Sequence, residues 1–178
     1  MDVDDEILVC LRDIYIGKSG KVVRLSERGK QLQTIQYDKD GRVLFKWPEY
    51  LTKAQNGDIW VSDTKDNCVV VSSAEGDLKF RYFGFEDILM NQKFQPRGLL
   101  TNRYNQILIA DINNHAIHLV DNDGHFLQFL LTKHHRIDCP VALCQDNDET
   151  LWVVCNDGKI KSKTYHQLPM QNHIEIYQ

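Results

Sequence analysis

The stretch ILIADINNHAIHLVDNDG, residues 107–124, decides the fold of this chain. Runs rich in Ile, Leu and Val precede Asp111 and follow His115, and such residues favour β-strands. The polar turn between the two runs is short, and Asp123-Gly124 then supplies residues that tolerate the positive φ of a tight hairpin. The stretch therefore predicts consecutive antiparallel strands joined by tight turns.

The same pattern recurs along the chain in a fixed register. Three prolines are spaced by 48 and 44 residues, and an anchor residue stands fifteen positions after each of them: Asp63, Asp111 and Cys155. An apolar run precedes each anchor, and a leucine stands three positions after each proline: Leu51, Leu99 and Leu143. Units of about 40 to 50 residues with four short strands each are the period of β-propeller blades.

We therefore expect an all-β chain, a partial propeller of about four four-stranded blades. An acidic tail covers residues 1–6, and the blades cover approximately residues 7–41, 42–84, 94–132 and 138–178. The first unit lacks an innermost strand, and the last is shortened after Cys155, with residues 173–177 as a candidate fourth strand. We expect burial between the blades for Ile59, Val61, Ile107, Ile109, Leu151 and Val153.

The two ends of such an open arc lack a neighbouring blade. We expect them to expose apolar side chains that a closed ring would cover, and exposed patches of this kind favour self-association. The candidates are Ile7, Val9 and Leu11 at one end, and Trp152 and Val154 at the other.

The segment from Asp111 through Asn114-His115 to Ile117 resembles the Asn-His-Leu signature of NHL repeats, with Ile in the third place. From Ile7 to about Tyr165 the chain resembles the C-terminal NHL region of tripartite-motif proteins, most closely the invertebrate members. The signature is intact in one repeat of four. The resemblance implies a six-bladed propeller in RING, B-box and coiled-coil ubiquitin ligases.

That resemblance implies a non-catalytic module that recognises a protein partner or a ubiquitylation substrate. No RING or B-box pattern of Cys and His occurs here, so we expect no ubiquitin-transfer chemistry in these residues. The alternative is an RNA-binding propeller, and a remote alternative is a metal-dependent lyase or lactonase. The candidate residues for a partner or RNA lie in or next to loops: Lys65, Arg97, Asn114, His115 and Lys133.

Composition and charge narrow the classes of function and cellular location that we expect. A net charge of −4 disfavours tight RNA binding, because phosphate contacts dominate that affinity. The five cysteines contain no CxxC pair and suit a reduced protein. No apolar stretch is long enough to span a membrane, and no signal peptide is evident, so we expect a cytoplasmic protein without a membrane partner.

Three groups of residues are candidate chemical sites. His134-His135, with Asp138 and Cys139 nearby, suggests a metal, but adjacent residues of an extended segment point to opposite sides, which favours a solvated loop. Asp63 and Asp111 are either ligands in a propeller channel or strand-ending residues that bond their own turns. Lys159, Lys161 and Lys163 form either a phosphate-binding stripe or an edge-protecting face. We expect no catalytic residue, metal or cofactor.

Overall fold

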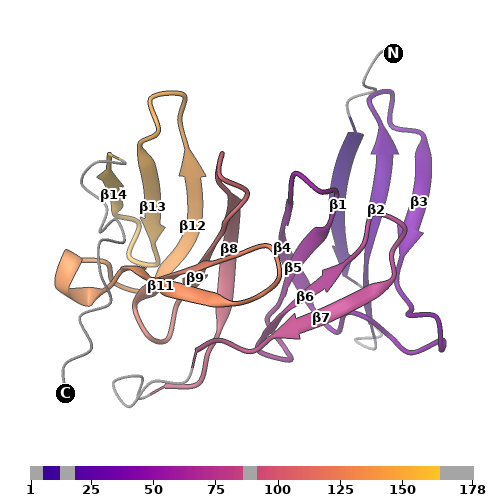
Figure 1. Ribbon diagram of the computed structural model, residues 1–178, viewed down its shortest axis with the longest axis horizontal. Helices are drawn as coiled ribbons and strands as arrows, with labels where there is room; N and C mark the ends of the chain where they lie inside the picture. The colour runs from indigo at the N-terminus through magenta and orange to yellow at the C-terminus, as the bar shows by residue number, and fades with distance from the viewer. Residues whose placement is uncertain (1–5, 13–18, 86–91, 165–178) are drawn as a thin grey trace.

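The computed structural model describes residues 6–12, 19–85 and 92–164, and these fold into four antiparallel sheets (Figure 1). The first sheet contains β1 (Glu6–Arg12), β2 (Gly20–Ser26) and β3 (Gln31–Ile35). The second contains β4 (Pro48–Lys53), β5 (Ile59–Asp63), β6 (Cys68–Ser72) and β7 (Leu78–Tyr82). The third contains β8 (Pro96–Thr101), β9 (Ile107–Asp111), β10 (Ala116–Val120) and β11 (Phe126–Leu131). The fourth contains β12 (Pro140–Gln145), β13 (Leu151–Cys155) and β14 (Ile160–Lys163).

Each sheet is a propeller blade in its connectivity, because its strands are hydrogen-bonded in the order in which they follow along the chain. The blades follow one another across Figure 1, from β1–β3 on the right to β12–β14 on the left. The first strands of blades two, three and four lie against one another, since β8 contacts both β4 and β12. The predicted all-β propeller fold is confirmed.

The predicted repeat register is also confirmed. Three leucines occupy the same place in the three inner strands, each opposite an apolar residue of the second strand: Leu51 with Val61, Leu99 with Ile109, and Leu143 with Val153. All six residues expected between the blades are buried, with at most 1% of their surface exposed.

Burial on both faces explains why the second and third strands of the two central blades read as continuous apolar runs. Side chains alternate across a strand, so Ile59 and Val61 join the core against blade one, whereas Trp60 joins the core against blade three. Blade three repeats this arrangement, with Ile109 facing blade two and Leu108 facing blade four. Three apolar cores thus hold the four blades together.

The connections between blades and the turns between the second and third strands lie at the same end of the sheets. A backbone hydrogen bond joins turn to connection in three successive blades: Thr64 N–H to the Trp47 carbonyl, Ile112 to Gln95, and Asn156 to Cys139. We call this end the connection face. It comprises the turns at residues 64–67, 112–115 and 156–159 together with the described parts of the connections before β4, β8 and β12.

The outer blades differ from the four-stranded expectation. Among the described residues, blades one and four each have three strands. Residues 1–5 of the expected tail and the expected strand at 173–177 lie outside the described part of the chain. Glu6, which we assigned to the tail, begins β1, and the loop expected at His134-His135 contains a 3₁₀ turn, η1 (Lys133–His135). No helix in the described ranges is long and apolar enough to cross a membrane.

The open ends of the arc expose apolar side chains, as the sequence predicts for three of the five candidates. Leu8 and Cys10 of β1 pack against the core, so Ile7 and Leu11 point away from it and are 48% and 41% exposed. At the other end, Trp152 is 40% exposed, although its repeat equivalent Trp60 is fully buried. Ile160, which pairs with Val154 on the neighbouring strand, is 61% exposed, whereas Val9 and Val154 are only partly exposed.

We expect the isolated chain to self-associate through these ends, because apolar patches next to unpaired strands favour association. Light scattering over a concentration series should show the mean mass rising with concentration. The double variant Trp152→Ser/Ile160→Ser should shift this rise to higher concentration. Phe83→Ser, which removes an exposed aromatic ring after β7, is the control and should leave it unchanged. A monodisperse monomer at high concentration would contradict the expectation.

Candidate functional site

Buried aspartates end the second strands of blades two and three and fasten the connection face. Asp63 is fully buried, and its carboxylate accepts hydrogen bonds from the backbone N–H groups of Lys46 (2.5 Å) and Trp47 (2.9 Å). Longer bonds from Lys65 and Asp66 tie the carboxylate to its own turn. Asp63 is therefore a structural acceptor, which favours the turn-bonding interpretation over that of a channel ligand.

Asp111 repeats this arrangement in blade three. Oδ1 accepts the N–H of Gln95 (3.1 Å), and Oδ2 accepts Nδ2 of Asn114 (2.7 Å). His118 Nε2 lies 3.4 Å from Oδ2. Burial by itself raises the pKa of Asp111, but His118, Asn114 and the Gln95 N–H together outweigh it and hold the pKa below its ordinary value.

The signature residues Asn114 and His115 also bond within the chain. Asn114 exchanges hydrogen bonds with the backbone of Gln92, in addition to its bond to Asp111. His115 Nδ1 accepts the backbone N–H of Cys139 at 3.1 Å, across the interface between blades three and four. Both side chains, which the sequence offers as partner contacts, thus connect the blade to its neighbouring connections.

Blade four differs because its anchor is Cys155 rather than an aspartate. In blades two and three, the N–H of the residue before the proline bonds to the anchor carboxylate. The equivalent residue in blade four is Cys139, and its N–H bonds instead to His115 from the preceding blade. Cys155 lines a pocket at this point of the connection face.

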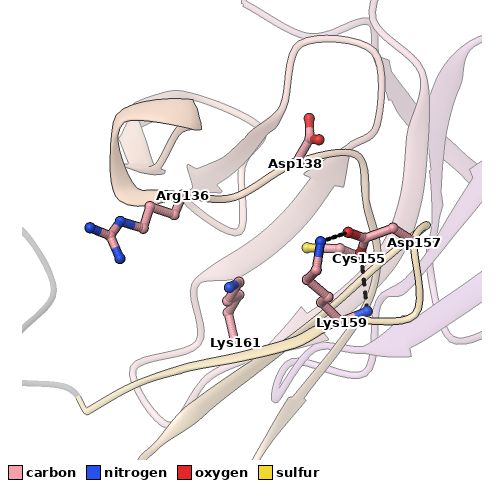
Figure 2. Close-up of a pocket in the computed structure, with 6 residues that line it drawn as sticks. All are labelled: Arg136, Asp138, Cys155, Asp157, Lys159 and Lys161. Atoms are coloured by element: carbon pink, nitrogen blue, oxygen red, sulfur yellow. Dashed lines mark hydrogen bonds and ion pairs between the residues drawn. The ribbon is translucent and has the colours of Figure 1, made fainter.

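That pocket has a volume of about 100 Å³ and opens to solvent between the connection before β12 and the hairpin that joins β13 to β14 (Figure 2). Figure 2 shows its six lining residues: Arg136, Asp138, Cys155, Asp157, Lys159 and Lys161. Three cations therefore surround it, with two carboxylates among them. Arg136 comes from the connection, and in Figure 2 its guanidinium group extends away from the two lysines of the hairpin.

The lysine side of the pocket has a defined charge arrangement. Lys159 Nζ lies 2.5 Å from Asp157 Oδ2, and this contact raises the pKa of Lys159 and lowers the pKa of Asp157. Both groups are therefore charged at neutral pH. Lys161 follows two residues later on β14, the last described strand of its sheet, and it lines the pocket together with Lys159.

Of the remaining sequence candidates, Lys65 and Lys133 lie on the connection face and Arg97 lies on β8. Arg97 forms an ion pair with Glu49, which also pairs with Arg12 at 3.4 Å. The charge of Arg97 is therefore partnered by a carboxylate of the neighbouring blade. Lys65 and Lys133 are exposed on separate connections or turns. The pocket residues Arg136 and Asp157 were not among the candidates, because neither belongs to a recognisable motif.

The histidine pair does not meet the acidic and thiol groups that sequence proximity suggests. His135 Nδ1 lies 3.2 Å from Thr132 Oγ1, within its own turn. Asp138 and Cys139 instead lie against His115, with Asp138 Oδ1 2.7 Å and Cys139 Sγ 3.6 Å from the same Nδ1 atom. A nucleophilic triad needs the thiol and the carboxylate on opposite ring nitrogens, so these three groups do not form one. Burial and the Asp138 charge also raise the pKa of the Cys139 thiol.

Comparisons with known proteins show which solved structures share this fold. No protein-family model matches the sequence, and no curated protein matches it. Among solved structures, a selenomethionine-substituted virginiamycin B lyase from Staphylococcus aureus is 19% identical with a TM-score of 0.56, over 81% of this chain and 48% of that one. A streptogramin B lyase is 20% identical with a TM-score of 0.54, over 81% and 47%.

The calcium-binding protein regucalcin from Agrobacterium tumefaciens is 13% identical with a TM-score of 0.56, over 84% of this chain and 49% of that one. This chain therefore spans about half the length of these β-propeller proteins. At such identities the likeness shows the fold, and it confirms that the chain is a β-propeller region.

Removal of an anchor aspartate tests its structural role. Asp63→Ala leaves the partly buried N–H groups of Lys46 and Trp47 without their acceptor, so we expect the free energy of unfolding to fall by about 1–3 kcal/mol. Asp148→Ala, on an exposed turn, is the control and should change it by less than about 0.5 kcal/mol. Urea unfolding at one protein concentration measures both. Equal stability of the two variants would contradict the role assigned to Asp63.

The pKa of Asp111 predicts a pH dependence. Its folded pKa lies below the unfolded value of about 3.9, so its stabilising contribution is complete above the unfolded pKa and is lost as pH falls through the folded pKa. We expect Asp111→Asn to lower the free energy of unfolding by about 1–3 kcal/mol at pH 7, and its difference from wild type to narrow below about pH 4. Urea unfolding across this pH range measures it, and a constant difference would be the contrary result.

Proposed function

We propose that the chain is a non-catalytic interaction module that binds an acidic segment of a protein partner in the pocket of blade four. The observation that carries this is the placement of Arg136, Lys159 and Lys161 around one opening. Loops held by a rigid scaffold commonly carry recognition, and here the apolar cores between blades fix the hairpin and the connection that form the pocket.

Binding of a protein is favoured over binding of RNA for two reasons. Recognition of single-stranded RNA relies on aromatic side chains that stack on bases, and none of the six lining residues is aromatic. Asp138 and Asp157 among the cations also repel a continuous phosphate backbone, whereas spaced Asp and Glu side chains of a peptide fit between them. Carboxylates of the partner are therefore the preferred ligands of the cations.

An enzymatic role is the alternative that the lyase neighbours raise. The residues that the sequence offers as channel ligands do not favour it, because the carboxylates of Asp63 and Asp111 accept hydrogen bonds that hold the connections. The pocket presents fixed charges rather than a nucleophile with its base. We therefore retain the binding role.

We extend the proposal to the pathway in which such a module would act, which is ubiquitylation. The sequence resemblance to the NHL region of tripartite-motif ubiquitin ligases supports a role in recognising a cytoplasmic substrate for ubiquitylation. In that setting the acidic segment would belong to the substrate, and the transfer chemistry would belong to a RING domain.

Fluorescence anisotropy with a labelled Glu-rich peptide tests the pocket. We expect the double variant Lys159→Ala/Lys161→Ala to bind about tenfold more weakly, since each exposed charge contact is worth up to about 1 kcal/mol. Added salt should weaken wild-type binding, because the contacts are screened. EDTA in all samples removes any effect of metal ions.

The matched control is Arg28→Ala/Lys30→Ala, which removes two exposed cations from the turn between β2 and β3. It should bind the peptide as wild type does. If both double variants lose peptide affinity equally, net charge rather than the pocket attracts the peptide. Tighter binding of a single-stranded RNA than of the peptide would overturn the choice of ligand.

A further inference from the structure

Three metal-ligating side chains meet beside the pocket, at the interface between blades three and four. They are His115, Asp138 and Cys139, and the atoms Nδ1, a carboxylate oxygen and Sγ all lie within 4.8 Å of one another. His115 comes from the turn after β9, whereas Asp138 and Cys139 come from the connection before β12. The donor set therefore joins two blades.

The backbone at Cys139 is strained. Cys139 has a φ of 44°, in the left-handed region that residues with side chains rarely adopt. His115 has a φ of 53°, which is the turn geometry of the repeat, since Asn67 at the equivalent position of blade two has a φ of 52°. Cys139 also directly precedes Pro140, a position that favours extended backbone. The Cys139 carbonyl accepts the Asn156 N–H, which fixes this strained residue against the hairpin. Strain of this kind is found where the surroundings hold a side chain in a required position.

The contacts around His115 Nδ1 conflict with one another. The Asp138 carboxylate, 2.7 Å away, requires a proton on Nδ1, but the Cys139 N–H, 3.1 Å away, requires a lone pair there. One nitrogen cannot meet both requirements at once. A cation bound to the Nδ1 lone pair takes the nearby carboxylate and sulfur as further ligands, and the Cys139 N–H then gives up its bond to Nδ1.

We propose that His115, Asp138 and Cys139 bind a zinc ion. Imidazole nitrogen, thiolate and carboxylate are the ligand types of zinc, and tetrahedral bonds of about 2.0–2.3 Å place nitrogen and sulfur about 3.5 Å apart. The observed separation of Nδ1 and Sγ is 3.6 Å. Asp138 is closer to Nδ1 than such bonds require, but its side chain is 63% exposed and has room to move outward.

The three ligands leave a fourth position for water, and the ion cross-links blades three and four. This is the interface at which the anchor is a cysteine and the N–H of Cys139 lacks an aspartate acceptor. The ion would fix the connection before β12 by coordinating Asp138 and Cys139, whereas Asp63 and Asp111 fix the preceding connections as hydrogen-bond acceptors. Metal bound only to the native state also raises the unfolding temperature.

Zinc titration of the purified chain, first stripped with EDTA, tests the site by calorimetry. We expect one zinc per chain, and an increase in Tm with zinc. Asp138→Asn and Cys139→Ser should each weaken zinc binding at least about tenfold, because the loss of a ligand costs at least as much as the loss of an outer-shell partner. Cobalt in place of zinc should give a sulfur-to-metal charge-transfer absorption that Cys139→Ser abolishes and Asp138→Asn retains in weakened form.

The matched controls are Cys144→Ser, which removes an exposed thiol of β12, and His134→Gln, which removes a member of the histidine pair. Both should keep wild-type zinc affinity. Circular dichroism establishes that each variant is folded, and Asp138→Asn, the exposed ligand, is the variant least able to disturb folding. Folded wild type without zinc binding would overturn the proposal. Zinc binding that survives in both Asp138→Asn and Cys139→Ser, or that is lost in either control, would also overturn it.

Discussion

Where the chain enters blades two, three and four, backbone N–H groups ahead of the inner strand are partly buried and bond to a side-chain acceptor. Unpaired buried N–H groups are costly, so the position of this acceptor decides where the connection lies. In blades two and three the acceptor is a fully buried aspartate at the end of the second strand. The same carboxylate also closes its own turn, so one side chain sets the geometry of the connection face.

The fourth blade shows what changes when this acceptor is absent. Cys155 occupies the anchor position, and His115 reaches across from blade three to accept the N–H of Cys139. At this interface a histidine, a carboxylate and a thiol lie together, and the pocket of blade four lies beside them. The proposed peptide site and the proposed zinc site therefore share the connection before β12, which supplies Asp138 to both.

The apolar cores impose a second constraint, since each central blade is covered on both faces. Trp60 and Trp152 hold equivalent positions, yet the first is fully buried and the second is 40% exposed. Among the described residues, blade three packs over Trp60, and no further blade packs over Trp152. A residue's burial in this fold is thus a property of the neighbouring repeat as much as of its own strand.

The sequence by itself determined the repeat, the register of the inner leucines and the residues buried between blades, because these depend on strand alternation and on fixed spacing within each unit. It also indicated that aspartates ending the second strands bond their turns. It did not determine that His115 meets Asp138 and Cys139, or that Arg136 and Lys159 line one pocket. Those residues are brought together by the packing of one sheet against the next and by the path of a connection. Local periodicity carries no information on either, so only the tertiary structure decided where the candidate sites lie.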